Sequence, residues 1–284
     1  TCSGQILLDG KDVLAMEERA LCAMRGCDVG MVFQEPMAAL NPLKTIGAQV
    51  AETVALHTGA SAAEAWAQAR MALARAELPE ERFAMTRYPH ELSGGQRQRV
   101  VIAMAIALRP KLLIADEPTT ALDVTVQKEV LALIRQLVAE DGMGLLLISH
   151  DLGLMRDQVE RVMVMYGGAV VESAPTKALF GMRAHPYSQG LFAARPQLGL
   201  KRGTRLQTIA GNVPEIFNWP QGCAFADRCA YVQDNCRQAL PQLELVSDTA
   251  DVIDDKVTKD ADKPRRVDEH WVRCPEWQKL ETSA

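Results

Sequence analysis

Two short runs of the sequence combine residue types that bind phosphate and metal ions. In the first, a Ser-Gly-Gly turn at residues 93–95 opens a helical stretch. The N–H groups at the start of a helix can bind an anion, and glycine lets the anion approach the backbone. In the second, an apolar strand at 112–115 ends in two carboxylates, Asp116 and Glu117. Together the turn and the carboxylate pair predict nucleoside triphosphate chemistry.

Each feature alone also has a structural explanation. Asp-Glu-Pro by itself more often caps the next helix, and Ser93 is an ordinary helix cap. Gln34 at the end of the apolar run 29–33, and His150 after the run 145–149, would each be usual as satisfied strand-end residues. The order and spacing of the four features along the chain favour the chemical interpretation.

Taken together, these residues resemble the motifs of the ATP-binding cassette (ABC) ATPases, whose signature is LSGGQ. The matching residues are Gln34, Ser93, Gly94, Gly95, Gln96, Asp116, Glu117, Asp123 and His150. The resemblance implies an α/β fold of the P-loop NTPase type, with a helical subdomain and a C-terminal extension. It also implies ATP hydrolysis with ATP and Mg2+ as cofactors.

The resemblance assigns a role to each strand-end residue. Glu117 is expected to be the general base that polarises the attacking water, and Asp116 to hold Mg2+ through water. Gln34 is expected to contact both Mg2+ and that water. His150 is expected to be the switch histidine that donates to the γ-phosphate. Glu117, His150 and Gln34 are thus the expected catalytic residues.

The signature residues 93–96 are implied to act on ATP held by an opposite subunit, so we expect a dimer. Asp123 matches the loop that crosses the dimer interface in the family. The family's phosphate-binding loop, G-x-x-x-x-G-K-[ST], is not found in the sequence. The nearest candidate, residues 4–12, has its glycines one residue too far apart, and Lys11 is read as a turn residue. We therefore expect an N-terminally truncated chain that alone is inactive.

Four cysteines form a second constellation: Cys223, Cys229, Cys236 and Cys274. Their spacings are wider than the Cys pairs of most zinc sites, and Pro275 after the last one resembles the Cys-Pro ending of iron–sulfur sites. A [4Fe–4S] cluster, a zinc ion and ordinary buried thiols all stay open. Cys274 is the least secure ligand, because a long charged interval precedes it.

Further residues resemble one branch of the family, the oligopeptide, dipeptide and nickel importers. They are the segments 87–92, 115–127, 184–188 and 222–229. The branch implies a second ABC ATPase subunit, identical or different, two transmembrane permease subunits and an extracytoplasmic solute-binding protein. We further expect the surface around residues 35–47 and the helices after it to receive a short cytoplasmic helix of a permease. Uptake of oligopeptides or dipeptides is the expected function.

Three alternatives stay open. A nickel or other small-solute importer belongs to the same branch, whose specificity lies mainly in the receptor and the membrane subunits. A non-transport ABC ATPase would carry a coiled coil or a second cassette, which the sequence lacks. A catalytically silent partner subunit is disfavoured by Glu117 and His150, although the missing phosphate loop keeps it open.

Apolar and polar periodicity predicts alternating strands and helices, and hence a mainly parallel sheet with helices around it. Strands are expected at 5–9, 29–33, 112–115, 144–149, 161–166 and 168–172. Helices are expected at 46–55, 62–76, 95–108, 126–140 and 152–159, with another starting at 185. We expect an ATPase domain at 1–182, with its helical subdomain at about 45–92, and an extension at 183–284. The charged stretch 251–269 is expected to be a mobile loop.

Composition narrows the class of protein. With 48% apolar and 24% charged residues the chain is ordinary for a globular protein, and its apolar runs are too short to span a bilayer. A net charge of −5 without a basic stripe gives no reason to expect nucleic acid. We expect a peripheral location at the cytoplasmic face of the inner or plasma membrane, reached through partner subunits.

Overall fold

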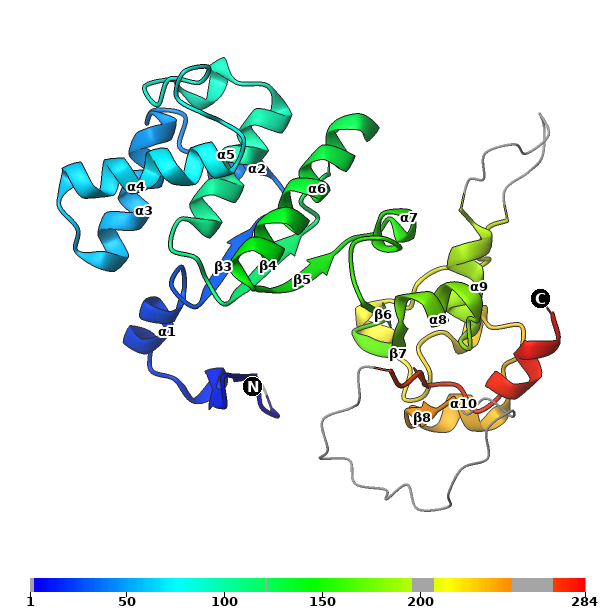
Figure 1. The fold of residues 1–284 in the computed structure, drawn as a ribbon. Coiled ribbons are helices and arrows are strands. Elements are labelled where there is room, and N and C mark those ends of the chain that lie inside the picture. Colours follow the sequence, from blue (N-terminus) through cyan, green and yellow to red (C-terminus); the bar gives the residue numbers. More distant parts are fainter. Residues whose placement is uncertain (1–2, 121, 196–206, 247–267, 284) are drawn as a thin grey trace. The chain divides into compact units, whose positions relative to one another are not determined.

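The computed structural model describes residues 3–120, 122–195, 207–246 and 268–283 (Figure 1). The chain forms two compact units, residues 1–154 and 155–284. This division lies before the domain boundary expected near residue 182. The expected boundary separates the ATPase region from the C-terminal extension, and it stays a prediction. Over the described ranges, no helix is long and apolar enough to cross a membrane.

A parallel three-stranded sheet forms the centre of the first unit. Its strands, in spatial order, are β3 (Val29–Val32), β4 (Leu112–Asp116) and β5 (Gly144–Ile148) (Figure 1). Val32 pairs with Ala115, and Asp116 pairs with Ile148. All three strands therefore end at the same edge of the sheet. The strands predicted in these three places are confirmed.

Helices α5 (Gly94–Ile106) and α6 (Val124–Asp141) pack with this sheet in one apolar core. Gly30 of β3 has no room for a side chain, because a Cβ there would lie 2.3 Å from the carbonyl oxygen of Ala105. Val32 and Leu113 are fully buried in this core. In contrast, Leu146 and Ile148 of β5 are exposed.

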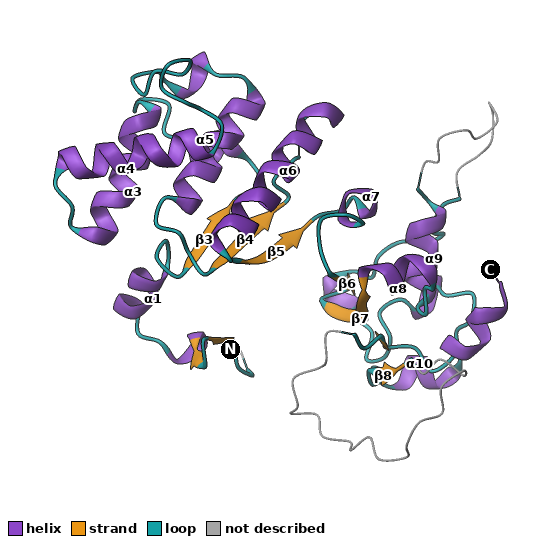
Figure 2. Cartoon of the chain, viewed as in Figure 1, coloured by secondary structure: helices purple, strands orange, loops and turns teal. Residues whose placement is uncertain are grey.

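A helical segment separates β3 from α5. It contains α2 (Pro36–Ala39), α3 (Ile46–Thr58), α4 (Ala62–Arg75) and the 3-10 turn η2 (Pro89–Glu91) (Figure 2). Thr45 caps α3, and Ser61 with Glu64 forms a capping box that starts α4. The helices predicted at 46–55 and 62–76 are confirmed.

The N-terminal residues differ from the prediction. A tight hairpin joins β1 (Leu7–Leu8) to β2 (Lys11–Asp12), followed by η1 (Val13–Ala15) and α1 (Glu18–Met24). Asp9 and Gly10 form the turn, with φ angles of 49° and 76°. Lys11 therefore lies in a strand and not in the turn, and the first strand is shorter than predicted.

The second unit contains an antiparallel sheet with the order β6-β7-β9-β8. Its strands are β6 (Arg161–Tyr166), β7 (Ala169–Pro175), β8 (Glu244–Leu245) and β9 (Trp271–Val272). Its helices and turns are α8 (Thr176–Gly181), α9 (Pro186–Ala193), η3 (Ile216–Asn218), η4 (Ala226–Arg228), α10 (Asp234–Gln238) and η5 (Trp277–Ser283). The prediction of a mainly parallel sheet thus holds for the first unit alone.

One predicted helix is shorter in the structure, and one predicted loop lies mostly outside the described residues. The helix predicted at 152–159 is the single turn α7 (Leu152–Met155). Most of the charged stretch 251–269 lies outside the described residues, so its predicted mobility stays a prediction.

Candidate active site and cysteine pocket

The edge at which the three parallel strands end brings the predicted catalytic residues together. Gln34 lies just beyond β3, Glu117 directly follows β4, and His150 lies just beyond β5. Glu117 has a left-handed backbone conformation, with φ of 44°, and its N–H donates to the carbonyl oxygen of Ile148 at 2.9 Å. A non-glycine residue adopts this conformation only where its surroundings enforce it, as they often do at functional sites.

Glu117 is the centre of a hydrogen-bonded group. Its Oε2 accepts from Gln34 Nε2 at 3.0 Å and from the hydroxyl of Thr120 at 2.8 Å. Its Oε1 lies 3.0 Å from Nδ1 of His150. The side chain of Glu117 is 23% exposed and that of His150 is 74% exposed. The predicted residues therefore meet through direct contacts, at a place that solvent reaches.

These contacts lower the pKa of Glu117. The hydroxyl of Thr120 has the largest effect, His150 comes next, and Gln34 adds a smaller one, whereas partial burial acts in the opposite direction. The ionised form of Glu117 is thus favoured, and a carboxylate there can accept a hydrogen bond from the His150 nitrogen that faces it.

Thr120 is the member of this group that sequence reasoning missed. It lies three residues after Glu117, in the turn that follows the strand. The sequence signal for it was its position shortly after Asp-Glu-Pro, because a hydroxyl three residues after a carboxylate can hydrogen-bond to it across a turn.

Asp116 is the last residue of β4 and is half-buried. Within the part of the chain that the structure describes, its carboxylate has no hydrogen-bond partner, unlike that of Glu117. Its predicted role as a water-mediated Mg2+ ligand stays a prediction.

The signature residues lie at the start of α5, where Ser93 and Gln96 form reciprocal hydrogen bonds. Ser93 accepts from the N–H of Gln96 at 3.3 Å, and Gln96 Oε1 accepts from the N–H of Ser93 at 2.9 Å. Ser93, Gly95 and Gln96 line an open depression of about 750 Å³, with Glu77 and Arg99 beside them. The structure thus leaves the signature facing an open space.

The two signature glycines differ in their surroundings. A Cβ on Gly95 would lie 2.6 Å from Cγ1 of Val126 on α6. A Cβ on Gly94 would lie 3.4 Å from Leu122, an ordinary contact. Gly95 is therefore required by the packing of α5 on α6, whatever else it binds.

Asp123 caps α6. Its Oδ1 accepts from the N–H groups of Thr125 and Val126, at 3.1 and 3.0 Å. This is a structural role, and the predicted role at a dimer interface stays a prediction.

In the second unit, one small cavity of about 20 Å³ is lined by all four predicted cysteines: Cys223, Cys229, Cys236 and Cys274. Each is a free thiol. Cys223 is tied to Cys236 by an N–H···O bond of 2.7 Å, and a Cβ on Gly222 would lie 2.2 Å from the same Cys236 oxygen. The structure therefore gathers residues from distant parts of the chain around one cavity.

Burial controls the acidity of these thiols. It raises the pKa of Cys223 and Cys229, and that of Cys274 to about 12. Neutral thiols are thus favoured unless a metal stabilises the thiolates. Among the described residues, no group of three His, Cys, Asp or Glu side chains is arranged to hold a single metal ion.

Comparison with known proteins identifies the family. A profile described as ABC transporter matches residues 1–120, and one described as oligopeptide/dipeptide transporter, C-terminal region, matches residues 171–236. A putative peptide import ATP-binding protein of Brucella melitensis is 48% identical over 255 residues, which cover 86% of this chain and 75% of the relative. The chain belongs to the ABC transporter ATP-binding proteins.

A second relative of this ABC family, also described as a putative peptide import ATP-binding protein and found in Brucella ovis, is 44% identical over 288 residues. The match covers 98% of this chain and 79% of the relative. The predicted family and its oligopeptide/dipeptide branch are confirmed. The C-terminal profile includes the first three clustered cysteines and ends before Cys274.

Solved structures of ABC cassettes confirm the predicted fold class. The ATP-binding cassette MJ0796, described as dimeric and bound to ADP and Pi, is 34% identical with a TM-score of 0.54, covering 61% of this chain and 74% of that one. CbiO1 of Clostridium perfringens is 28% identical with a TM-score of 0.55, covering 63% and 68%. The protein is accordingly an ABC-type ATPase, and ATP and Mg2+ are the cofactors of this family.

Proposed function

We propose that the protein is the ATPase subunit of a peptide importer. The observation that carries this proposal is the hydrogen-bonded group of Gln34, Glu117 and His150 at the edge of a parallel sheet, in a chain whose relatives are named peptide import ATP-binding proteins. The group contains a carboxylate that can accept a proton during ATP hydrolysis, and the names of the relatives support a role in peptide import.

In this proposal Glu117 is the general base. Its Oε2 is occupied by two donors, whereas Oε1 accepts from His150 alone and keeps a lone pair for the attacking water. His150 lowers the pKa of Glu117. When the imidazole turns to donate to a γ-phosphate, Glu117 loses this contact and becomes a stronger base at the moment when ATP is in place.

The signature supports a second ATPase subunit, either identical or different. Residues 93–96 would contact the γ-phosphate of ATP held by that subunit, with the helix N-terminus favouring the negative charge. The open depression beside Ser93 and Gly95 leaves room for this approach. Asp123, which already caps α6, would lie at the same interface.

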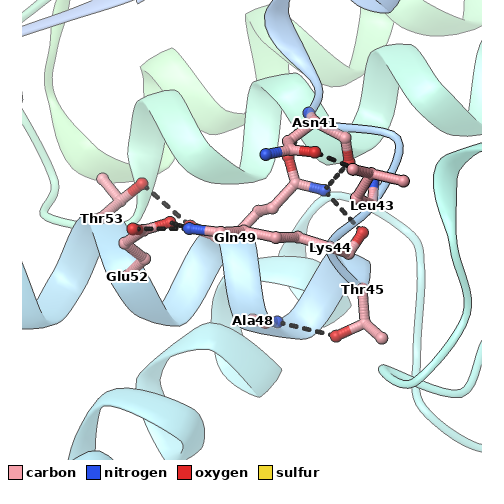
Figure 3. Close-up of polar contacts among 8 residues, drawn as sticks. All are labelled: Asn41, Leu43, Lys44, Thr45, Ala48, Gln49, Glu52 and Thr53. Atoms are coloured by element: carbon pink, nitrogen blue, oxygen red, sulfur yellow. Dashed lines mark hydrogen bonds and ion pairs between the residues drawn. The ribbon is translucent and has the colours of Figure 1, made fainter.

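A permease helix is proposed to dock near residues 41–45 (Figure 3). The buried Gln49 bonds to the N–H and C=O of Asn41, at 2.8 and 3.1 Å, and to the C=O of Lys44 at 3.0 Å. Lys44 is paired with Glu52 at 2.7 Å, whereas Leu43 is 85% exposed. A firmly held loop thus presents an apolar side chain next to a depression of about 380 Å³.

This docking surface follows Gln34 closely along the chain. A contact between Gln34 and bound nucleotide could therefore shift the surface and couple hydrolysis to transport. Cysteines introduced at Leu43 and along the cytoplasmic loops of a permease should form cross-links. Failure of every loop to cross-link at Leu43, with no more product than a cysteine at the exposed Leu7 outside this surface gives, contradicts the docking site.

The complete importer would contain two permease subunits and an extracytoplasmic solute-binding protein, with this subunit at the cytoplasmic face of the membrane. The test is ATP-driven uptake into vesicles that hold the assembled complex. Uptake of dipeptides and oligopeptides is expected. Uptake of nickel ions without peptide uptake would favour the small-solute alternative, and ATP hydrolysis with no transported solute would overturn the importer assignment.

For the cysteine pocket we propose a structural [4Fe–4S] cluster. The donor set fits, since four thiols line one cavity and such clusters take four cysteine ligands. A single tetrahedral zinc ion needs sulfur atoms roughly 3.8 Å apart. A cluster binds each sulfur through a different iron, so its four cysteine ligands need not converge on one metal ion.

The cluster would connect residues 223–236 to Cys274 in a region with a small core of its own. Anaerobic purification, iron and sulfide analysis and visible absorption provide the test. Four irons per chain are expected. Stoichiometric zinc in a colourless protein would replace the cluster with a zinc site, and neither metal would leave ordinary thiols.

A further inference from the structure

His185 lines the same cavity as the four cysteines. Its side chain is buried, with only 2% of the residue exposed. Most other lining residues are apolar, such as Phe225, Val232 and Pro275, and Arg273 adds a charged side chain. A polar group in such surroundings acts strongly on whatever charge is held beside it.

The hydrogen bonds of His185 fix the position of its proton. Nδ1 accepts from the N–H of Tyr187 at 3.1 Å, which caps the start of α9. Burial lowers the pKa of His185 to about 4, so the ring is neutral near pH 7. A neutral ring with a lone pair on Nδ1 carries its proton on Nε2. Within the described residues, Nε2 has no hydrogen-bond partner.

The backbone at His185 is also firmly held. Its N–H donates to Oε2 of the fully buried Glu172 at 3.1 Å, and the preceding N–H, of Ala184, donates to Oε1 at 2.7 Å. The ring centroid lies 6.0 Å from that of Phe225, which stands between Cys223 and Cys229 in sequence. Together with the bond from Tyr187, these contacts limit the positions that the ring can take.

We propose that His185 donates a hydrogen bond from Nε2–H to a sulfur atom of the cluster held by the four cysteines, and so raises its reduction potential. The inference rests on the proposed cluster. Reduction adds negative charge to the cluster and its thiolates, and an N–H donor stabilises the more negative state. His185 is thereby a tuning residue and not a ligand.

His185→Asn tests the inference. Asparagine keeps an oxygen that caps the N–H of Tyr187, as it does at many helix starts, but it lacks the distant N–H of the imidazole. Ser188→Ala is the matched control, because Ser188 is equally buried on the same helix and its hydroxyl has no partner among the described atoms. Iron content and a mediated redox titration, followed by visible absorption and electron paramagnetic resonance, are measured on the full-length protein.

The expected result is a full iron content in all three proteins, with the midpoint potential shifted to a lower value in His185→Asn alone. Full iron content with an unchanged potential in His185→Asn overturns the inference and leaves the cluster in place. An equal shift in Ser188→Ala also overturns it, because the effect would then come from general repacking. Absence of iron from the unmodified protein overturns the proposed cluster and the inference together.

Discussion

Replacing Gly95 with alanine separates two reasons for a glycine in the signature. The new Cβ would lie 2.6 Å from Cγ1 of Val126, so either the Val126 side chain or the two helices must shift. Overpacking of this kind costs about 1–3 kcal/mol. Gly95 lies in the first turn of α5, so the propensity gain of alanine in a helix interior adds little here. We therefore expect Gly95→Ala to lower the free energy of unfolding by about 1–3 kcal/mol.

Three further variants complete the design: Val126→Ala, the Gly95→Ala/Val126→Ala pair, and Gly94→Ala. The pair lacks the clashing methyl group, so it should be more stable than the sum of the two single changes by about 1 kcal/mol. Gly94→Ala has only an ordinary contact with Leu122 and should not destabilise the protein. Urea unfolding followed by circular dichroism measures the unmodified protein and the four variants.

ATP hydrolysis is then measured on the stable variants in the assembled complex. If the signature glycines also admit a phosphate to the backbone, Gly94→Ala and the double variant stay folded but hydrolyse ATP slowly. A Gly95→Ala protein as stable as the unmodified one would refute the packing argument. Full hydrolysis in the double variant would show that packing alone requires Gly95.

Three other predictions concern the side chains of Thr120, Gln49 and His185. Thr120→Val removes the hydrogen bond that lowers the pKa of Glu117 most, so a 13C carboxyl NMR titration should show this pKa rising towards its ordinary value. Thr120→Ser keeps the hydroxyl and should leave the pKa lowered. An unchanged pKa in the valine variant speaks against the contact. Gln49→Leu removes three hydrogen bonds to the 41–45 loop. It should lower the free energy of unfolding by roughly 1–3 kcal/mol and speed hydrogen exchange of the amides in that loop. Unchanged exchange contradicts the role of Gln49. Burial lowers the pKa of His185 from 6.5 to about 4 in the folded state. The contribution of His185 to the free energy of unfolding is therefore complete above pH 6.5 and falls by up to about 3 kcal/mol as the pH drops towards 4. Urea unfolding at several pH values should show this dependence in the unmodified protein and not in His185→Asn.

The sequence predicts those parts of the site that depend on local pattern. Apolar runs ending in polar residues predict strands whose ends meet at one edge, and the structure joins Gln34, Glu117 and His150 there. Parallel strands make this inference possible, because their carboxyl ends all lie on the same side. The catalytic roles of the three residues stay predictions, since proximity does not test them.

Contacts between distant segments escape such reasoning. The close approach of Gly95 to Val126 depends on how two helices pack, which no local pattern encodes. The buried pair of Glu172 and His270, joined at 2.7 Å, depends on β9 pairing with β7 from nearly a hundred residues away. The short hairpin around Lys11 shows a second limit, since turn-forming residues do not fix where a strand begins.

The central claim is that this ABC subunit hydrolyses ATP with Glu117 as its general base. Steady-state phosphate release is measured with MgATP on an importer assembled with the complete subunit, including a phosphate-binding loop, for the unmodified protein and for Glu117→Gln. This measurement tests the claim most directly when nucleotide binding is measured in parallel. We predict that turnover falls by about 10²–10⁴-fold while binding is kept. Near-normal turnover in Glu117→Gln would contradict the claim.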